Sequence, residues 1–253
     1  MSTRMGGVST GPFASMNLRP PGLFNNPQQP QRFDASDAIA VNQQRYAQAL
    51  QARPVYLNQV HGAEVLHVRA NTPDLLQADA AVTTEVGVAP TVLVADCLPV
   101  LFCTADGYAV GAAHAGWRGL AAGVLENTVA ALRELCGSAQ TPIYAWLGPC
   151  IGPAAFEVGE NVLQAFGVNP DARDGRRDYG KAFQNQTMRE GRQRWLANLP
   201  LLARERLQLC GVQHISGGQW CTYSQSELFY SYRRESVTGR MAASVCKPSI
   251  CLK

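Results

Sequence analysis

The chain is poor in charged residues and has no long uninterrupted hydrophobic run. Only 16% of its 253 residues are charged, whereas 46% are hydrophobic. A chain of this length and apolar content can bury a large core, which excludes intrinsic disorder. The longest apolar stretch, residues 86–103, is broken by glycine, proline, threonine and aspartate, so it is unsuited to span a bilayer. No linker-like break is present, which favours one domain or two closely packed halves.

Lysine is rare, and the charges form no clusters. There are 3 lysines against 19 arginines, and the formal net charge is only +3. The scattered charges indicate no binding surface for nucleic acid or membrane, and neither partner is expected. The N-terminus lacks the apolar segment of a signal peptide, so we expect a cytoplasmic protein.

Two cysteine patterns are missing as well. The 8 cysteines include no Cys-x-x-Cys pair and no zinc-finger spacing. A large cytoplasmic chain normally keeps its thiols reduced, so no disulfide framework is expected. Only position along the chain can then identify a reactive cysteine. Cys150 and Cys221 each lie in a loop that could face the candidate site described below, and neither is assigned a role.

Strand and helix patterns alternate along the chain, which favours mixed sheets covered by helices. Helical patterns cover residues 34–52, about 120–137, 160–166 and 183–207, the last with an interruption at Pro200. Strand patterns cover residues 55–60, 64–69, 91–103, 108–113, 143–147 and 212–215. The long third pattern should break near Pro99, because proline cannot donate to a central ladder. Irregular surface segments are expected at residues 1–33 and 171–181.

Three turns that carry potential metal ligands follow predicted strands. They contain His61, Cys97 and His114, the two histidines lying close to Gly62 and Gly116. Loops at strand ends gather on one edge of a sheet, where sites are usually built. Two histidines and one cysteine with a free fourth position describe a catalytic zinc site, in which the metal makes a water easier to deprotonate. On these residues alone, the alternative that they are ordinary core side chains stays open.

The turn at residues 116–119 opens a predicted helix directly after a strand. The unpaired N–H groups of a helix start and the neighbouring Arg118 are suited to hold an anion. The alternative that Trp117 simply packs in the core, and that Arg118 pairs with an acid, is equally open.

Five motifs occur in order along nearly the whole chain. They are residues 58–62 (NQVHG), 95–100 (ADCLPV), 113–119 (AHAGWRG), 147–149 (LGP), and 231–234 (SYRR) with 238–240 (TGR). Together they resemble the YfiH family, also called the laccase-domain or multicopper polyphenol oxidoreductase family. Members of that family are regarded as purine nucleoside phosphorylases with adenosine deaminase activity.

The resemblance implies a fold and a set of site residues. The implied fold is α+β, a single α/β/β/α domain over residues 1–253 with two mixed sheets. His61, Cys97 and His114 match the family's zinc ligands, with copper as the alternative metal. The arginine that the family associates with its substrate pocket falls on Arg45, although Gln44 precedes it where the family has asparagine. The family's Ser-Thr-Arg-x-Gly-Gly-Val-Ser motif lies at residues 2–9, so the strand that usually precedes it is expected to be missing.

Three enzymatic hypotheses follow, and a non-enzymatic binding module is the weakest alternative. The first is a zinc-dependent enzyme that cleaves adenosine, inosine or methylthioadenosine with phosphate and also deaminates adenosine; Arg45 and Arg118 would bind the substrates. The second is copper-dependent phenol oxidation, which 4 histidines scarcely support. The third needs no metal and uses Cys97 as a nucleophile with His61 or His114 as the base. The expected partners are a purine nucleoside and phosphate, and the oligomeric state is not indicated.

Overall fold

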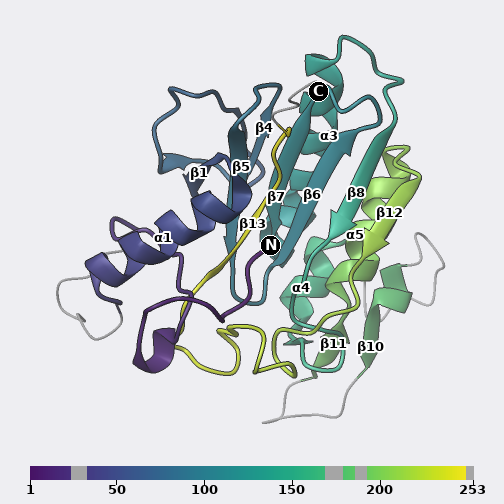
Figure 1. The fold of residues 1–253 in the computed structure, drawn as a ribbon. Coiled ribbons are helices and arrows are strands. Elements are labelled where there is room, and N and C mark those ends of the chain that lie inside the picture. Colours follow the sequence, from purple (N-terminus) through teal and green to yellow (C-terminus); the bar gives the residue numbers. More distant parts are fainter. Residues whose placement is uncertain (24–32, 169–178, 186–192, 249–253) are drawn as a thin grey trace.

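The structure is a computed structural model that describes residues 1–23, 33–168, 179–185 and 193–248. Two large mixed sheets form its centre (Figure 1). The smaller one has four strands in the order β13, β5, β1, β3. Their bounds are β1 Arg53–Asn58, β3 Leu76–Gln77, β5 Val88–Val94 and β13 Met241–Ser244. Strand β1 runs parallel to both β3 and β5, whereas β13 is antiparallel to β5.

The larger sheet has six strands in the order β12, β8, β6, β7, β4, β2. Their bounds are β2 Val65–His67, β4 Ala80–Thr83, β6 Leu98–Thr104, β7 Val110–Ala115, β8 Ile143–Leu147 and β12 His214–Gly217. The two outer pairs, β12 with β8 and β2 with β4, are parallel, and the inner pairs are antiparallel. A third, small antiparallel sheet joins β9 (Glu157–Val158), β10 (Phe183–Asn185) and β11 (Trp195–Ala197).

Helices cover the outer faces of the two large sheets. Helix α1 (Ser36–Leu50) lies across the four-stranded sheet, and α3 (Val124–Leu135) and α5 (Leu199–Leu209) lie behind the six-stranded one (Figure 1). The shorter elements are η1 (Gly11–Phe13), α2 (Trp117–Ala122), α4 (Glu160–Ala165) and η3 (Tyr179–Ala182). The predicted α/β/β/α fold class is therefore confirmed.

The strands have two apolar faces because each large sheet lies between two apolar layers. In β5, Val92 packs between the sheets while its neighbour Leu93 packs beneath α1. In β7, Ala112 faces the other sheet and Ala113 faces α3 and α5. Successive side chains of a strand point to opposite faces, so burial on both faces requires a continuous apolar run. This explains why these strands read as unbroken hydrophobic segments.

The prediction of a helix over residues 183–207 is wrong for the part that precedes residue 199. The structure has β10 and β11 in its first part, residues 186–192 lie outside the described residues, and a helix begins only at Leu199. Asn198 caps that helix, because its side-chain oxygen accepts from the backbone N–H of Leu201 over 3.0 Å. Pro200 is in the first turn, where a missing N–H costs nothing, and it interrupts no helix.

Other predicted boundaries shift by a few residues. The helix near residues 120–137 is two helices, α2 and α3, which meet at Gly123 with φ +95°. The apolar segment 91–103 divides into β5 and β6 at residues 95–97, and Pro99 is the second residue of β6. Of the predicted surface segment 171–181, residues 171–178 lie outside the described residues. Within the described part of the chain, no helix is both long and apolar enough to cross a membrane.

Candidate active site

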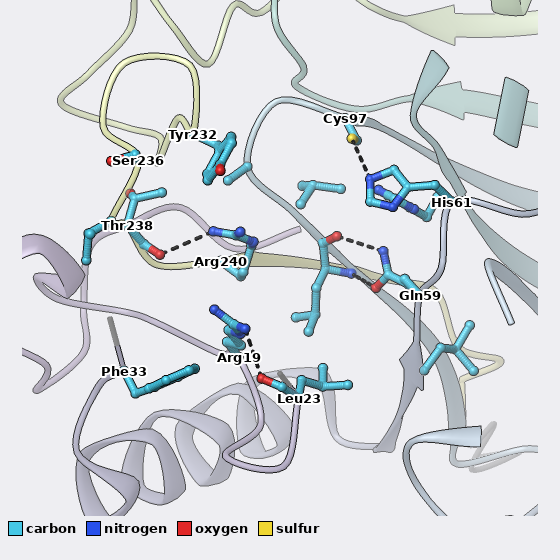
Figure 2. Close-up of a pocket in the computed structure, with 16 residues that line it drawn as sticks. Arg19, Leu23, Phe33, Gln59, His61, Cys97, Tyr232, Ser236, Thr238 and Arg240 are labelled. Atoms are coloured by element: carbon cyan, nitrogen blue, oxygen red, sulfur yellow. Dashed lines mark hydrogen bonds between the residues drawn. The ribbon is translucent and has the colours of Figure 1, made fainter. Parts of the chain in front are cut away.

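His61, Cys97 and His114 meet at strand ends of the two large sheets. His61 follows β1 of the four-stranded sheet, Cys97 lies between β5 and β6, and His114 is the second-last residue of β7 in the six-stranded sheet. One donor atom from each lies within 4.8 Å of the other two. The Sγ atom of Cys97 is 3.9 Å from Nε2 of His61 (Figure 2). His114 is buried, Cys97 is partly exposed and His61 is exposed, so the cluster has one open side.

A buried aspartate that the sequence analysis missed, Asp79, organises this cluster. Its carboxylate accepts hydrogen bonds from the backbone N–H groups of Val60, His61 and Gly62 at 3.0, 3.0 and 2.7 Å. These bonds hold the turn in which His61 adopts a left-handed backbone with φ +61°. The available signal was a single aspartate inside the apolar run 78–82, since a fully buried carboxylate needs several partners.

Asp79 also orients His114, which lies on β7. The Nδ1 atom of His114 is 2.8 Å from Oδ1 of Asp79, so Nε2 is the nitrogen left to face the cluster. Burial by itself raises the pKa of Asp79, but His114 and the N–H groups of Gly62 and Val60 together hold it below its usual value. A carboxylate behind a histidine in this way is the common outer partner of a metal-binding imidazole.

Cys97 and His114 favour each other's charged forms. Burial alone would raise the pKa of the Cys97 thiol, but the adjacent His114 and His61 lower it to about 6. Burial lowers the pKa of His114, yet Cys97 and Asp79 raise it to about 9. The cluster thus stabilises a thiolate, which is the form of cysteine that binds metals and attacks electrophiles.

Two glycines of the AHAGWRG motif are required because atoms of neighbouring turns lie too close to leave room for a side chain. A Cβ on Gly116 would lie 2.9 Å from Sγ of Cys97 and 3.1 Å from Cδ2 of His61. A Cβ on Gly119 would lie 2.7 Å from the carbonyl oxygen of Gly62. Any other residue would therefore displace the turns that carry the cluster. The motif keeps the start of α2 close to His61 and Cys97.

The open side of the cluster faces a cavity of about 540 Å³. This volume is typical of small-molecule sites, which measure ~300–1,000 Å³. Two arginines to which no role was assigned from the sequence line it, namely Arg19 and Arg240 of the TGR motif, as do the aromatic rings of Phe33 and Tyr232 (Figure 2). Among the described residues that line the cavity, none carries a carboxylate. The cavity therefore combines a cationic side with the thiolate and imidazole cluster.

The two cavity arginines are held by the backbone around them. Arg240 donates to the carbonyl oxygens of Thr238 and Gly239 at 3.2 and 3.0 Å. Arg19 donates to the carbonyl oxygen of Leu23 over 2.8 Å, and its guanidinium lies over the Phe33 ring. Burial and the positive charge of Arg19 lower the pKa of Arg240 to about 10, which leaves it charged at neutral pH.

Arg45 and Arg118 lie elsewhere. Arg45, on α1, donates to the carbonyl oxygen of Gly6 over 2.9 Å, and Arg118 lies over the Trp117 ring at 4.4 Å. Neither is among the residues that line the cavity. The substrate-binding role predicted for them stays a prediction, and variants described below test it.

The remaining histidines lie apart from the cluster. His67 ends the short strand β2. His214, on β12, packs on Tyr144 with a ring separation of 4.7 Å. Among the described residues, His61, Cys97 and His114 are the group with donor atoms close enough to share a metal ion.

These three residues suit zinc. Two imidazoles and one thiolate are common ligands of a catalytic zinc ion, which leaves a fourth position for a substrate or water. Bonds of about 2.0–2.3 Å to a tetrahedral zinc place its ligand atoms ~3.3–3.6 Å apart, so the observed 3.9 Å between sulfur and nitrogen needs only a small side-chain rotation. The hydrogen bond between Asp79 and Nδ1 of His114 supplies the carboxylate partner that metal-binding histidines commonly have.

Comparison with known proteins identifies the family of this chain. Residues 1–247 match the family described as multi-copper polyphenol oxidoreductase laccase. The chain belongs to this laccase-like family. The family resemblance seen in the five motifs is thereby confirmed.

Relatives in this laccase-like family carry a different functional name. The chain is 44% identical to purine nucleoside phosphorylase YfiH of Escherichia coli, over 96% of this chain and 91% of that protein. It is 45% identical to a purine nucleoside phosphorylase of Pseudomonas aeruginosa, over 97% and 91%. A crystal structure of a Neisseria meningitidis protein shares 39% identity with a TM-score of 0.80, covering 98% of this chain and 92% of that one.

Proposed function

We propose that this chain is a zinc-dependent purine nucleoside phosphorylase, acting on adenosine, inosine and methylthioadenosine, with adenosine deaminase activity. The supporting observation is that one cavity holds both the cluster of His61, Cys97 and His114 and the guanidinium groups of Arg19 and Arg240. The relatives named purine nucleoside phosphorylase support the same activity.

Arg19 and Arg240 are the proposed phosphate-binding groups. Phosphorolysis requires a phosphate anion held next to C1′ of the ribose while the glycosidic bond breaks. Guanidinium groups bind phosphate through paired, charge-assisted hydrogen bonds, which strengthen where water is excluded. None of the described residues that line the cavity carries a carboxylate, so its described lining holds cationic groups without an acidic one.

Phe33 and Tyr232 are the proposed binding surface for the purine base. Both aromatic rings line the cavity, and the guanidinium of Arg240 lies 5.8 Å from the centre of the Tyr232 ring. Flat aromatic surfaces stack on a base without demanding a particular pattern of hydrogen bonds. This arrangement would accept several purine nucleosides, in agreement with the proposed range of substrates.

His61, Cys97 and His114 are the proposed ligands of zinc. A zinc ion held there would act as a Lewis acid that polarises a substrate oxygen and makes a water easier to deprotonate, which deamination at C6 of adenine requires. Cys97 contributes a thiolate whose charge the histidines stabilise. Asp79 keeps His114 in the orientation in which Nε2 faces the cluster and holds the turn of His61 in place. Strands and a buried carboxylate thus fix the ligands before any substrate binds.

The proposal is tested with zinc-loaded protein, inosine and phosphate. The expected products are hypoxanthine and ribose 1-phosphate, separated by chromatography, and the same protein with adenosine but no phosphate is expected to release inosine and ammonia. Cys97→Ala and His114→Ala are the negative controls. Product formation equal to that of these variants would overturn the phosphorylase assignment, and loss of the second reaction alone would remove only the deaminase.

A second candidate, hydrolysis with Cys97 as nucleophile, is favoured by one observation. The low pKa of Cys97 next to His114 and His61 is also what a cysteine hydrolase needs. Removal of metal separates the two schemes. Activity that survives complete chelation but is lost after alkylation of Cys97 would support the nucleophile, whereas restoration of activity by zinc supports the metal.

Copper-dependent phenol oxidation, which the family description suggests, is supported less well. A multicopper centre needs several metal ions with many histidine ligands. In the described structure two of the four histidines, His67 and His214, lie away from the cluster, so the cluster offers donors for one metal ion. Assay of phenol oxidation with copper-loaded and zinc-loaded protein distinguishes the two metals.

A further inference from the structure

Cys150 and Cys221 form a second pair of sulfur groups, outside the metal-ligand cluster. Cys150 follows β8 and Cys221 lies in the loop after β12, and the two residues are partners in an isolated parallel β-bridge. Two backbone bonds hold this pairing: Thr222 N donates to Cys150 O over 2.9 Å, and Cys150 N donates to Trp220 O over 3.5 Å. Paired strands lie about 4.8 Å apart, which is within the ~4.4–6.8 Å that a disulfide spans between Cα atoms.

The sulfur of Cys221 is surrounded by hydrogen-bond donors. The backbone N–H of Gly152 donates to it over 3.2 Å, and Tyr223 and Ser224 donate to it as well. A Cβ on Gly152 would lie only 3.0 Å from this sulfur, so the glycine permits the close approach. Burial alone raises the pKa of Cys221, but the donors lower it below the usual value of a thiol. Cys221 is also partly exposed, so a small oxidant can reach it.

Cys150 has the opposite environment. It is fully buried, and burial followed by the charge of Cys221 raises its pKa well above the ordinary value. Cys150 is therefore a protonated thiol that solvent does not reach. The pair combines an accessible sulfur whose thiolate is stabilised with a protected thiol directly beside it, which is the arrangement of a reactive and a resolving cysteine.

We propose that Cys221 is a modification site for a small peroxide and that Cys150 converts the oxidised sulfur into a disulfide. The Cys221 thiolate attacks one oxygen of hydrogen peroxide, the O–O bond breaks, and hydroxide leaves. The Cys150 thiol then attacks the resulting sulfenic sulfur, and its proton leaves with the hydroxyl group as water. The hydroxide from the first step takes up the proton that Cys221 lost on ionisation. In sum, two thiols and one peroxide give one disulfide and two waters.

The proposed bond would join two segments that hold the neighbour of Cys97. Thr222, next to Cys221, donates its hydroxyl to Oδ1 of Asp96 over 2.6 Å. Ile151, next to Cys150, donates its backbone N–H to the carbonyl oxygen of Asp96 over 2.8 Å. Oxidation would therefore fix two of the hydrogen-bond partners of Asp96, one residue away from the candidate metal ligand.

The test maps the bond directly and does not depend on the proposed enzymatic activity. Reduced full-length protein is treated with a few equivalents of hydrogen peroxide, its free thiols are alkylated, and the denatured protein is digested with chymotrypsin. Cleavage after Trp146 and Trp220 separates Cys150 from Cys136 and Cys221 from Cys210. Mass spectrometry is expected to find one peptide pair joined through Cys150 and Cys221.

Three variants make the result decisive. The matched control Cys210→Ser should retain the cross-link, Cys221→Ser should lose it, and Cys150→Ser should leave a Cys221 sulfenic acid that dimedone traps. The proposal is overturned if Cys221 stays reduced while other cysteines react, or if its sulfenic acid persists in the wild-type protein beside a free Cys150. Circular dichroism shows whether Cys150→Ser folds. If it does not, the disulfide maps of the wild-type protein and of Cys210→Ser still show whether Cys150 and Cys221 become joined.

Discussion

The two sides of the cavity are built in different ways. One side carries His61, Cys97 and His114, which lie at the ends of strands and are tied to the buried Asp79. The other carries Arg19 and Arg240, which are held by backbone carbonyl groups of the segments around them. The first side is a fixed arrangement with its own network of hydrogen bonds. The second is assembled from the N-terminal and C-terminal parts of the chain, so the two sides should fail in different ways when they are altered.

The largest expected effect follows removal of a proposed zinc ligand. Cys97→Ala and His114→Ala should each lose bound zinc and lower kcat/KM at least ~1,000-fold, because the Lewis acid is lost. The change in Tm should stay within about 4 °C, since the large core does not depend on the cluster. Elemental analysis and thermal unfolding check both statements. A variant that failed to fold would show that the cluster is structural and would remove the proposed contrast.

The next largest effect is expected for Asp79→Asn, which tests whether Asp79 positions His61 and His114. Asp79→Asn keeps the size of the side chain but removes the charge that three N–H groups and His114 face. Loss of such an outer partner lowers metal affinity by about 10–100-fold. Competition with a zinc chelator measures this affinity, and the exposed Asp106→Asn is the matched control. An unchanged affinity in Asp79→Asn would mean that the strands alone place His61 and His114.

The same contrast explains what could be predicted from the sequence. His61 and Cys97 follow β1 and β5, and His114 is the second-last residue of β7, so the strand pattern was enough to place all three at or near strand ends. Arg19 and Arg240 lie in irregular segments separated by more than two hundred residues, and only the completed fold brings them together. No periodicity marks such residues, because their position depends on tertiary packing.

The fold, like the site, was predictable where a local sequence pattern marks the element, and not elsewhere. The strands of the two large sheets are buried on both faces and therefore appear as continuous apolar runs, as in β5 and β7. The short strands β10 and β11 were not predicted, because each has only three residues. So short a segment cannot show whether its hydrophobic residues alternate as in a strand or recur with the period of a helix. Asn198 and Pro200 mark the observed start of α5 in the sequence, because an asparagine cap followed by a proline in the first turn is typical of a helix N-terminus.

A smaller effect is expected on the arginine side. Arg240→Ala should raise the KM for phosphate by about 10–100-fold, the equivalent of the ~1.5–3 kcal/mol of a hydrogen bond to a charged group. Bound zinc should be unchanged, because Arg240 lies outside the ligand set. Steady-state kinetics at varied phosphate and elemental analysis measure the two quantities. Loss of zinc from Arg240→Ala would contradict the independence of the two sides.

Arg45→Ala and Arg118→Ala are the matched controls for this variant. Both replace an arginine that does not line the cavity, so each should change the KM for phosphate less than about threefold, or below ~0.7 kcal/mol. A tenfold or larger increase in either variant would confirm the substrate-binding role predicted from the sequence. It would also mean that the substrate extends beyond the cavity.

Among the residues that line the cavity, the smallest effect is expected for the aromatic surface. Tyr232→Ala removes a ring that lines the cavity and should raise the KM for the nucleoside by about 2–10-fold, since an aromatic pair contributes ~0.5–1.5 kcal/mol. Tyr232→Phe keeps the ring and should restore the KM, which separates stacking from a hydrogen bond of the hydroxyl group. The KM for phosphate should stay constant in both variants. A change in phosphate affinity alone would show that Tyr232 acts by placing Arg240, whose guanidinium lies close to its ring, and not by contact with the base.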